Sequence, residues 1–498
     1  MIGEKQQAVT ALFFSTLAFT VCFACWMMNG VLVTFLVDNG AYGWNKAQIG
    51  WLIGIPVLTG SIMRLPLGML TDKYGGKIIL TLLMIVSALP MYLMSRADSY
   101  AQFILGSLGF GLVGASFSVG IAYTSVWFPK EKQGTALGIF GMGNAGSALT
   151  SLGAPLILKH LTNNAAAIEG WRNLPKIYAA ILLGMAALFF LATHARKVAS
   201  EGKTLVQQLA PLKEIRVWRF GLYYFLVFGG FVALAQWLIP YYVNVYTMSI
   251  AMAGMMASIF SLPSGVIRAF GGWLSDKFGA RRVMYWVLGS CCAASLLLIV
   301  PRMDIYSPGG GVMALSGGTV SELTDHEIVI SGIVTKKYAF KPKETVQGLA
   351  EDRDILILPT SRFWQEPAVK VGDVVKKKQL LAKGLTHVYF QANVWIFTFL
   401  VFVVGIMMGI GKAAVYKHIP DYFPQEVGVV GGIVGVIGGL GGFIGPIIFG
   451  YLLDLTGIWT TAWMFFAALS LISLLWMHWV IQKMMRQKVP GLMNQMET

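Results

Sequence analysis

Two arginines at matching places in a duplicated segment are the residues of this chain best suited to chemistry. Arg64 lies eight residues before Asp72, and Arg268 lies eight residues before Asp276, with a constant offset of 204 positions. Each arginine belongs to a long apolar run, about 12 Å along a helix from the basic turn that ends the run. A guanidinium at that depth in a membrane faces a bundle interior or a watery cavity. Two such groups would repel each other unless an anion lay between them, so the pair predicts an anion-binding site.

The alternative is that each arginine satisfies helix carbonyls or anchors a neighbouring helix, but this explanation would have to hold twice. The duplication also repeats a charged turn that contains glycine. Its shared positions are Gly68, Asp72, Lys73 and Gly75 in the first copy and Gly272, Asp276, Lys277 and Gly279 in the second. A duplication this regular predicts two structural repeats. We expect each turn to act as a gating loop.

The composition places the chain in a membrane. Of its 498 residues, 56% are hydrophobic and 12% are charged, whereas a soluble domain carries about 25% charged residues. About twelve apolar stretches reach the roughly 20 residues that a membrane-spanning helix requires. They are residues 10–36, 48–71, 78–96, 101–127, 134–158, 174–195, 218–243, 250–275, 283–301, 393–418, 427–453 and 460–482. We therefore predict an all-α membrane protein with twelve transmembrane helices.

The net charge of +15 gives an orientation. Lysine and arginine collect in alternate loops and in the C-terminal tail, which the positive-inside rule places in the cytoplasm together with both termini. The expected location is the cell inner (plasma) membrane, with multiple passes through the lipid bilayer. Because the basic residues lie in separate loops between spans, the charge does not favour nucleic acid as a partner. The sequence has no nucleophile–base pair, metal cluster or nucleotide loop, so we expect neither an enzyme nor a cofactor or metal.

Four other residues inside predicted spans have polar or aromatic side chains of interest. Asn144 lies in a glycine-rich span, where it could join helices or bind a substrate. Tyr224 and Phe228 lie one turn apart on one helix face, where they could pack against lipid, pack against neighbouring helices or line a cavity. Lys412 lies deep in the tenth predicted span, among glycine and alanine. It must extend to the interface, find a partner or lose its proton.

The second repeat is longer than the first by 91 residues, which lie at about 302–390. The alternation of loops places this insert outside the cytoplasm, and its short β-type runs predict a small β-rich domain. Residues 369–384 are similar to the half-barrel repeat of biotinyl and lipoyl carrier domains, but no hairpin presents a modifiable lysine. The insert is a candidate for binding a periplasmic partner of unknown identity.

The predicted organisation is an N-terminal six-helix bundle at 1–196, a cytoplasmic connector at 197–217, helices seven to nine at 218–301, the insert at 302–390, and helices ten to twelve with a cytoplasmic tail at 391–498.

Together these motifs resemble the major facilitator superfamily and, within it, the nitrate/nitrite porters. The resemblance rests on the duplicated Gly-x-Leu-x-Asp-Lys-x-Gly turn, on Arg64 and Arg268, and on the glycine-rich spans around Asn144 and at 428–445. It implies two pseudo-symmetric six-helix bundles with a substrate site at the midplane between them.

The same resemblance implies that a nitrate is held between the two arginines. It also implies that Phe117, Tyr224 and Phe228 supply aromatic side chains around the anion. Nitrate is planar, monovalent and weakly hydrated, and a guanidinium offers a matching fork of donors. We expect secondary active transport of nitrate, nitrite or both by alternating access.

Two coupling schemes are open. In exchange, repulsion between the arginines stops the empty carrier from reorienting, so nitrite must return as nitrate enters. In symport, a proton travels with the anion, and Lys412 is the leading carrier of that proton because no carboxylate lies deep in a span. We favour symport. Further alternatives are a porter of another small anion and a non-transporting anion sensor that uses the insert as its receptor domain.

Overall fold

The computed structural model describes residues 2–164, 166–196, 210–300, 303–343, 360–390, 392–423 and 427–488. The chain divides into two compact units. The helical unit comprises Met1–Ile299 and Thr398–Thr498, and the insert unit comprises Val300–Phe397. Most of the predicted connector, at 197–209, and the end of the predicted tail, at 489–498, lie outside the described residues.

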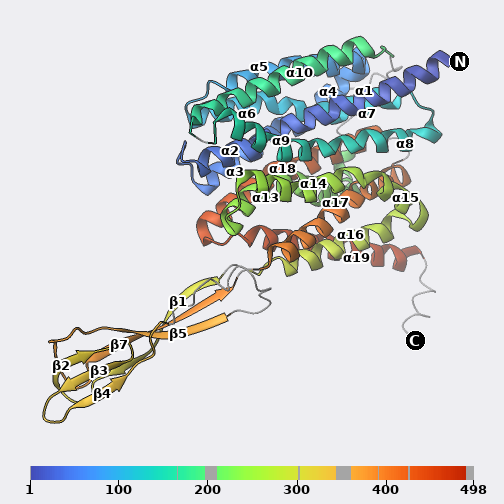
Figure 1. Cartoon of the computed structure of the whole chain (residues 1–498). Helices are drawn as coiled ribbons and strands as arrows, with labels where there is room; N and C mark the ends of the chain where they lie inside the picture. The colour runs from blue at the N-terminus through green and yellow to red at the C-terminus, as the bar shows by residue number, and fades with distance from the viewer. Residues whose placement is uncertain are drawn as a thin grey trace. The chain divides into compact units, whose positions relative to one another are not determined.

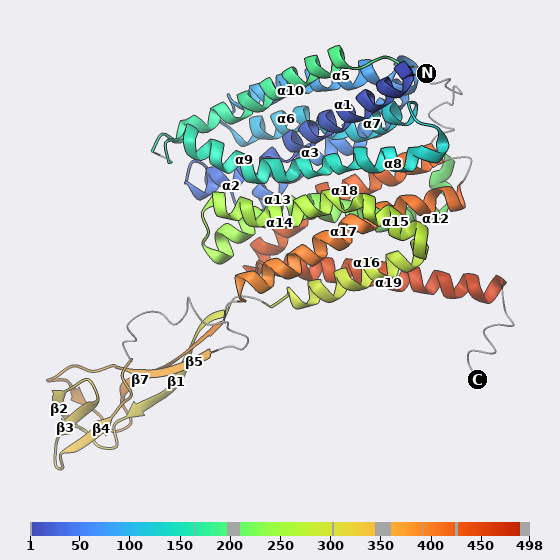
Figure 2. The same ribbon diagram turned by 45° about the vertical axis from the view of Figure 1, so that its right-hand side comes forward.

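The helical unit contains two sets of helices, one from each sequence repeat. The first set is α1 (Ile2–Trp26), α2 (Met28–Asp38), α3 (Lys46–Ile62), α4 (Arg64–Tyr74), α5 (Gly76–Met94), α6 (Tyr100–Phe110), η1 (Gly111–Ala115), α7 (Ser116–Ser125), α8 (Lys130–Gly141), η2 (Met142–Ala145), α9 (Gly146–Leu161), η3 (Ile168–Arg172) and α10 (Asn173–Ala192). The second set is η4 (Ala210–Lys213), α12 (Ile215–Tyr224), η5 (Phe225–Gly229), α13 (Gly230–Tyr246), α14 (Ile250–Val266), α15 (Arg268–Phe278), α16 (Ala280–Leu297), α17 (Val394–Tyr422), α18 (Val427–Thr456) and α19 (Thr461–Lys488). In both views the first set lies on one side of the unit and the second set on the other (Figures 1 and 2).

Apolar helices long enough to cross a membrane dominate this unit. Within the described ranges there are nine of them, or ten if α14 and α15 count as one bent span. The prediction of a mostly helical, multi-pass membrane protein is confirmed. The predicted spans 134–158 and 283–301 are helical, in α8–α9 and α16, but do not belong to this apolar set. Residues 134–151 are rich in glycine and small polar residues, and α16 carries two arginines near its start, which lowers the mean hydropathy of both segments.

Two helices break directly before an arginine. α3 ends at Ile62 and α4 begins at Arg64, while α14 ends at Val266 and α15 begins at Arg268 after a bend of 47°. The turns that follow are also alike, because α4 and α15 each end at a glycine with positive φ, 89° at Gly75 and 83° at Gly279. Side chains with a β-carbon rarely adopt that conformation. The sequence duplication is therefore a duplication of backbone geometry.

Helices of opposite repeats approach each other at glycine. A β-carbon on Gly50 of α3 would lie 2.3 Å from the backbone oxygen of Pro446 in α18. A β-carbon on Gly254 of α14 would lie 2.0 Å from the backbone oxygen of Ser151 in α9. Only a residue without a side chain permits such an approach. The two repeats thus meet along α3–α18 and α9–α14.

The insert unit contains two antiparallel sheets. One has the order β1-β7-β5 and the other has the order β4-β3-β2-β6. The strands are β1 (Met303–Met313), β2 (Gly318–Leu323), β3 (Glu327–Ser331), β4 (Lys336–Ala339), β5 (Thr360–Pro367), β6 (Val374–Val375) and β7 (Leu380–Phe390). Alternating residues such as Ile328 and Ile330 of β3 are buried with Val320 and Leu381 in a small apolar core. This core gives the insert a hydrophobic centre of its own.

Candidate functional site

Arg64 begins α4 and is only 2% exposed. Its Nη1 donates a hydrogen bond of 2.6 Å to the backbone oxygen of Gly435 in α18, on the opposite repeat. Its Nε and Nη2 have no hydrogen-bond partner among the described residues. The guanidinium carbon lies 4.9 Å from the ring centroid of Phe228 and 5.3 Å from that of Phe117. One edge of the guanidinium fork is therefore buried with its donors free.

Arg268 begins α15 and is 7% exposed. Its guanidinium carbon lies 5.2 Å from the ring centroid of Phe117 and 5.8 Å from that of Tyr416. Its Nη1 is buried without a hydrogen-bond partner among the described residues. A β-carbon on Gly141 of α8 would lie 3.0 Å from its Cδ. Arg268 thus reaches a glycine-rich helix of the first repeat, as Arg64 reaches one of the second repeat.

Both guanidiniums face the ring of Phe117, a residue of α7 that is 2% exposed. Neither arginine forms an ion pair with a carboxylate in the described parts of the chain. Each cation–π contact contributes about 0.5 to 2 kcal/mol, whereas an unpaired buried charge costs several kcal/mol. Two like charges in one apolar site are therefore energetically costly, and a bound anion would lower that cost.

Aromatic rings form a layer beside the arginines. The rings of Tyr224 and Phe228 stack with centroids 5.0 Å apart and planes 6° apart. Phe228 lies 6.2 Å from Phe117 by ring centroids, so the three aromatic residues of the sequence prediction come together. Phe228 belongs to η5, a π-helical turn between α12 and α13, and such turns occur frequently at functional sites.

Tyr416 of α17 completes the aromatic layer, and sequence reasoning missed it. Its ring lies edge-on to Tyr224 with a centroid distance of 5.0 Å, and its hydroxyl donates a 3.0 Å hydrogen bond to the backbone oxygen of Gly431. A signal for it existed, because Tyr416 lies four residues after Lys412 and shares its helix face. Trp26 of α1, whose ring centroid is 5.8 Å from the Arg64 guanidinium, was also not predicted.

Asn144 lies in η2, a short 3₁₀ segment between α8 and α9, and it is fully buried. Both atoms of its side-chain amide lack a hydrogen-bond partner among the described residues. The structure records no hydrogen bond between this amide and either arginine. Asn144 follows Gly141, the neighbour of Arg268, by three residues. The free amide of Asn144 therefore lies one helical turn from Gly141, the neighbour of Arg268, but it does not bind either arginine.

Lys412 of α17 is fully buried beside the arginine site. Its Nζ lies 3.3 Å from Oγ of Ser264 and 3.2 Å from the ring centroid of Phe231. Ser264 precedes Arg268 by four residues, so the amino group of Lys412 lies about one helical turn from Arg268. The described residues provide no carboxylate partner for Lys412. Lys412 is therefore a second buried basic group near the arginine pair.

The duplicated turns lie at the helix ends, apart from the arginine site. Asp276 accepts an ion pair of 2.6 Å from Lys417 of α17, and both side chains are largely exposed. Lys277 lies 5.0 Å from the ring centroid of Trp273, and in the first copy Lys73 lies against the ring of Tyr74. A β-carbon on Gly68 or Gly272 would meet no atom within 4 Å. The side chain of Asp72 is outside the described part of the structure.

At the other end of the same helices, Asp454 of α18 joins the two repeats. Its carboxylate accepts hydrogen bonds from the backbone amides of Lys46, at 3.1 Å, and Ala47, at 2.9 Å, in the first turn of α3. A carboxylate at a helix N-terminus is favourable because the amides there are unpaired and the helix dipole is positive. Trp51 of α3 also donates to the hydroxyl of Tyr451 at 3.3 Å. The repeats are thus connected at the end away from the duplicated turns.

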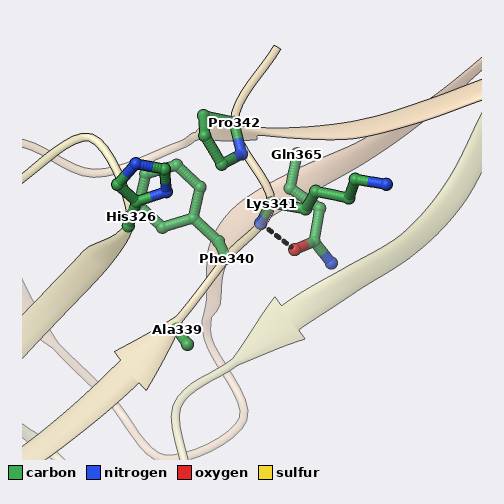
Figure 3. Close-up of a pocket in the computed structure, with 6 residues that line it drawn as sticks. All are labelled: His326, Ala339, Phe340, Lys341, Pro342 and Gln365. Atoms are coloured by element: carbon green, nitrogen blue, oxygen red, sulfur yellow. Dashed lines mark hydrogen bonds between the residues drawn. The ribbon is translucent and has the colours of Figure 1, made fainter. Parts of the chain in front are cut away.

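A shallow hollow of about 490 Å³ lies on the insert unit, at the end of β4 (Figure 3). It is lined by His326, Ala339, Phe340, Lys341, Pro342 and Gln365. The side-chain oxygen of Gln365 accepts a 3.0 Å hydrogen bond from the backbone amide of Lys341. Among the described residues of the lining there is no carboxylate to pair with the histidine or the lysine.

Comparison with known proteins places this site in a wider context. Residues 14–340 and 380–491 match the Major Facilitator Superfamily. The chain is 37% identical to the "Probable nitrate/nitrite antiporter NarK1" of Thermus thermophilus, over 99% of this chain and 96% of that protein. It is 26% identical to the "Probable nitrate transporter NarT" of Staphylococcus epidermidis, over 95% of this chain and 97% of that protein.

Solved structures share the fold at low sequence identity. The chain matches a bacterial homologue of the human lysosomal transporter Spinster, in an inward-facing and occupied conformation, with a TM-score of 0.58 and 15% identity. That match covers 95% of this chain and 96% of the other. The nucleoside transporter NupG matches with a TM-score of 0.57 and 13% identity over 95% of this chain and 98% of the other. At these identities the similarity establishes the fold alone.

Proposed function

Because the chain belongs to the nitrate/nitrite porter family of the major facilitator superfamily, we propose that it transports nitrate, nitrite or both across the cell inner membrane by alternating access. One observation carries the proposal. Two buried guanidiniums from opposite repeats, Arg64 and Arg268, face the ring of Phe117 without a carboxylate partner in the described residues. Such a site is suited to binding a small anion. The names of the relatives indicate that this anion is nitrate or nitrite.

Arg64 presents the donors that suit a planar oxyanion. Its free Nε and Nη2 lie along one edge of the guanidinium and can donate two parallel hydrogen bonds to two oxygens of one nitrate. Its Nη1 is already held by Gly435, which fixes the fork in place. Arg268 supplies a second charge and the free Nη1 donor. The stacked rings of Tyr224 and Phe228 exclude water, and the free amide of Asn144 is a further candidate donor.

For the topology, we propose twelve spans in two six-helix bundles with both termini in the cytoplasm. Each predicted span corresponds to a helix or to a run of consecutive helices, from α1–α2 to α19. In this orientation the duplicated turns with Asp276 and Gly279 face the cytoplasm as gating loops. The insert at 302–390 then lies outside the cytoplasm, where its role is open.

Alternating access follows from the contacts between the repeats. Asp454, at the proposed external end, joins α18 to the first turn of α3, and both arginines are nearly inaccessible. An empty site keeps two repelling charges close together. A bound anion neutralises them and lowers the electrostatic cost of moving one repeat against the other. The external contacts must then break for the site to open outward.

The coupling is proposed to be nitrate/proton symport through Lys412, with exchange as the alternative. Lys412 favours symport because it is fully buried one turn from Arg268, so nitrate in the site would stabilise its protonated form. Exchange is favoured by the repulsion between the arginines and by a relative named as a nitrate/nitrite antiporter. Both schemes use the same anion site.

Uptake of labelled nitrate into proteoliposomes tests the proposal. We would compare an imposed inward proton gradient with nitrite preloading, for the wild type, for Lys412→Met and for the control Lys159→Met, whose lysine is exposed in the last turn of α9. Uptake that follows the gradient and is lost only in Lys412→Met supports symport. Uptake that requires internal nitrite and does not depend on the proton gradient would support exchange instead. Nitrate binding without flux under either condition would contradict transport and leave an anion sensor.

A further inference from the structure

A cluster of basic side chains lies away from the arginine pair, inside the second repeat. It surrounds a pocket between α12, α16, α17 and α19, which we call the Arg219 pocket. Its polar lining consists of Arg219, Tyr223, Arg281, His418 and Tyr422. These residues come from helix ends on the side that carries the duplicated turns. Among the side chains that the structure describes, none that lines the pocket is acidic.

Arg219 is the most buried arginine of this pocket. It is 8% exposed, and it forms no ion pair with a carboxylate in the described residues. Its one recorded ring contact is with Phe220, at 5.6 Å. The hydroxyl of Tyr223, on a side chain 2% exposed, also lacks a hydrogen-bond partner among the described residues. A buried hydroxyl without a partner is costly unless a ligand satisfies it, and the largely buried arginine beside it supplies a positive charge.

Two further arginines add positive charge around the pocket, and a buried histidine completes its wall. Arg281 donates a hydrogen bond to the hydroxyl of Tyr422. The guanidinium of Arg216 lies 5.6 Å from the same tyrosine ring. The imidazole of His418, 5% exposed, stacks on Phe220 with centroids 5.5 Å apart and planes 5° apart. Three arginines therefore gather around two aromatic rings with no carboxylate in the lining.

The size and the remaining wall of the pocket indicate the kind of anion. The pocket is partly open and has a volume of about 20 Å³, enough for about one water-sized group. One oxygen of an oxyanion fits inside, and the rest of the ligand must lie outside. The wall that α19 contributes to the pocket is apolar and consists of Met477, Val480, Ile481 and Met484. A ligand with one charged oxygen in the pocket and a hydrocarbon part along α19 fits both features.

Exposed tryptophans place the pocket at the level of lipid headgroups. Trp218, next to Arg219, is 49% exposed, and Trp479 of α19 is 61% exposed. Lys483 lies over the Trp479 ring at 5.4 Å. Tryptophan and lysine in this arrangement are typical of a membrane–water interface.

We propose that the Arg219 pocket binds the phosphate of an anionic phospholipid in the leaflet at the end of the helices that carries the duplicated turns. Basic pockets between transmembrane helices are suited to such headgroups. A phosphate oxygen accepts from Arg219 and Tyr223, and the acyl chains lie against α19. This lipid joins α12 to α19 and stabilises the second repeat without entering the nitrate site.

The test measures thermal stability of the purified full-length protein in phosphatidylcholine nanodiscs, with and without added phosphatidylglycerol. A ligand that binds only the folded state raises the unfolding temperature. We expect the wild type and the control Arg282→Gln, an exposed arginine beside the pocket, to gain stability from phosphatidylglycerol. Arg219→Gln should lose most of that gain. Tyr223→Phe, which keeps shape and charge, should lose part of it and serves if Arg219→Gln does not fold.

Native mass spectrometry of the same samples then counts the retained phosphatidylglycerol, with one molecule fewer expected for Arg219→Gln than for Arg282→Gln. Equal lipid retention and equal stabilisation in the two variants would overturn the proposal. Stabilisation by inorganic phosphate in pure phosphatidylcholine, lost in Arg219→Gln, would assign the pocket to a free oxyanion and overturn the lipid. The readout is lipid binding, so it stays separate from the outcome of the nitrate experiments.

Discussion

Arg64 and Arg268 occupy the same place in two copies of one sequence motif, yet their surroundings differ. Arg64 is fixed by a 2.6 Å hydrogen bond to the backbone of the opposite repeat. Arg268 has no such bond in the described residues; its guanidinium faces the ring of Phe117 in the opposite repeat, and its Cδ lies beside Gly141. Duplication has therefore placed the same charge twice, while packing has anchored only one of the two. We infer that Arg64 orients the anion and that Arg268 mainly supplies charge and is free to adjust.

Replacing each arginine with lysine should have the largest effect on nitrate affinity and should distinguish the roles of the two arginines. Arg64→Lys should weaken nitrate binding about hundredfold, because the fork and the Gly435 bond are lost together and each bond to a charged group contributes about 1.5 kcal/mol or more. Arg268→Lys keeps the charge and should weaken binding only about tenfold. Isothermal titration of nitrate into purified protein measures both. Equal losses in the two variants would contradict the assignment of different roles.

Phe117 is shared by the two arginines, so its replacement should affect both sides of the comparison. Phe117→Leu removes two cation–π contacts, worth about 0.5 to 2 kcal/mol each, and should weaken nitrate binding about tenfold or more. The control is Phe13→Leu, whose ring is 61% exposed on α1. The same titration provides the measurement, and the unfolding temperature shows whether the fold is intact. Binding as strong as in the wild type would remove Phe117 from the site.

The glycine beside Arg268 allows a finer test. A β-carbon on Gly141 would lie 3.0 Å from Cδ of Arg268, so Gly141→Ala must displace a flexible side chain. We expect nitrate affinity to fall about threefold, a cost of less than about 1 kcal/mol. Gly432→Ala is the matched control on α18, because its β-carbon meets no atom within 4 Å. An equal loss of affinity in the control would mean that helix composition, and not contact with Arg268, causes the effect.

The smallest effect concerns the contact at the end away from the duplicated turns. Asp454→Asn removes a charge at the start of α3, worth about 0.3 to 1 kcal/mol, and should raise the outward-open population about two- to fivefold. Spin labels at Gly43→Cys and Leu455→Cys, one in each repeat, would report the longer distance by double electron–electron resonance. The four native cysteines are buried and free of disulfides. Asp98→Asn breaks a pair with Arg172 inside the first repeat and should leave the distances unchanged.

Much of the fold was predictable from the sequence, because hydropathy and charge act locally. The offset of 204 residues located both arginines, and the structure repeats even the helix breaks before them. The 3₁₀ and π segments, such as η2 and η5, were not predictable in the same way. They depend on packing between helices that are distant in sequence. Hydropathy alone also does not single out α16, which carries two arginines near its start.

The candidate site was predictable only in part. Charge and depth singled out Arg64 and Arg268, whereas Phe117 entered through the family resemblance and not through its spacing. The Arg64–Gly435 bond depends on how α18 packs, so no local pattern indicates it. Tyr416 shares a helix face with Lys412 and could have been found. Asp454 was visible only as an acidic residue near a span end, because its partners are backbone amides.

The central claim is that one nitrate binds between Arg64 and Arg268. A double-mutant cycle of nitrate titrations tests it most directly, using Arg64→Ala, Arg268→Ala, the double variant and the exposed control Arg282→Ala. If both arginines hold the same ion, each single variant should lose nearly all affinity and the double variant should lose little more, because the effects are coupled. Arg282→Ala should bind one nitrate as the wild type does. Wild-type affinity in either single variant would contradict the claim.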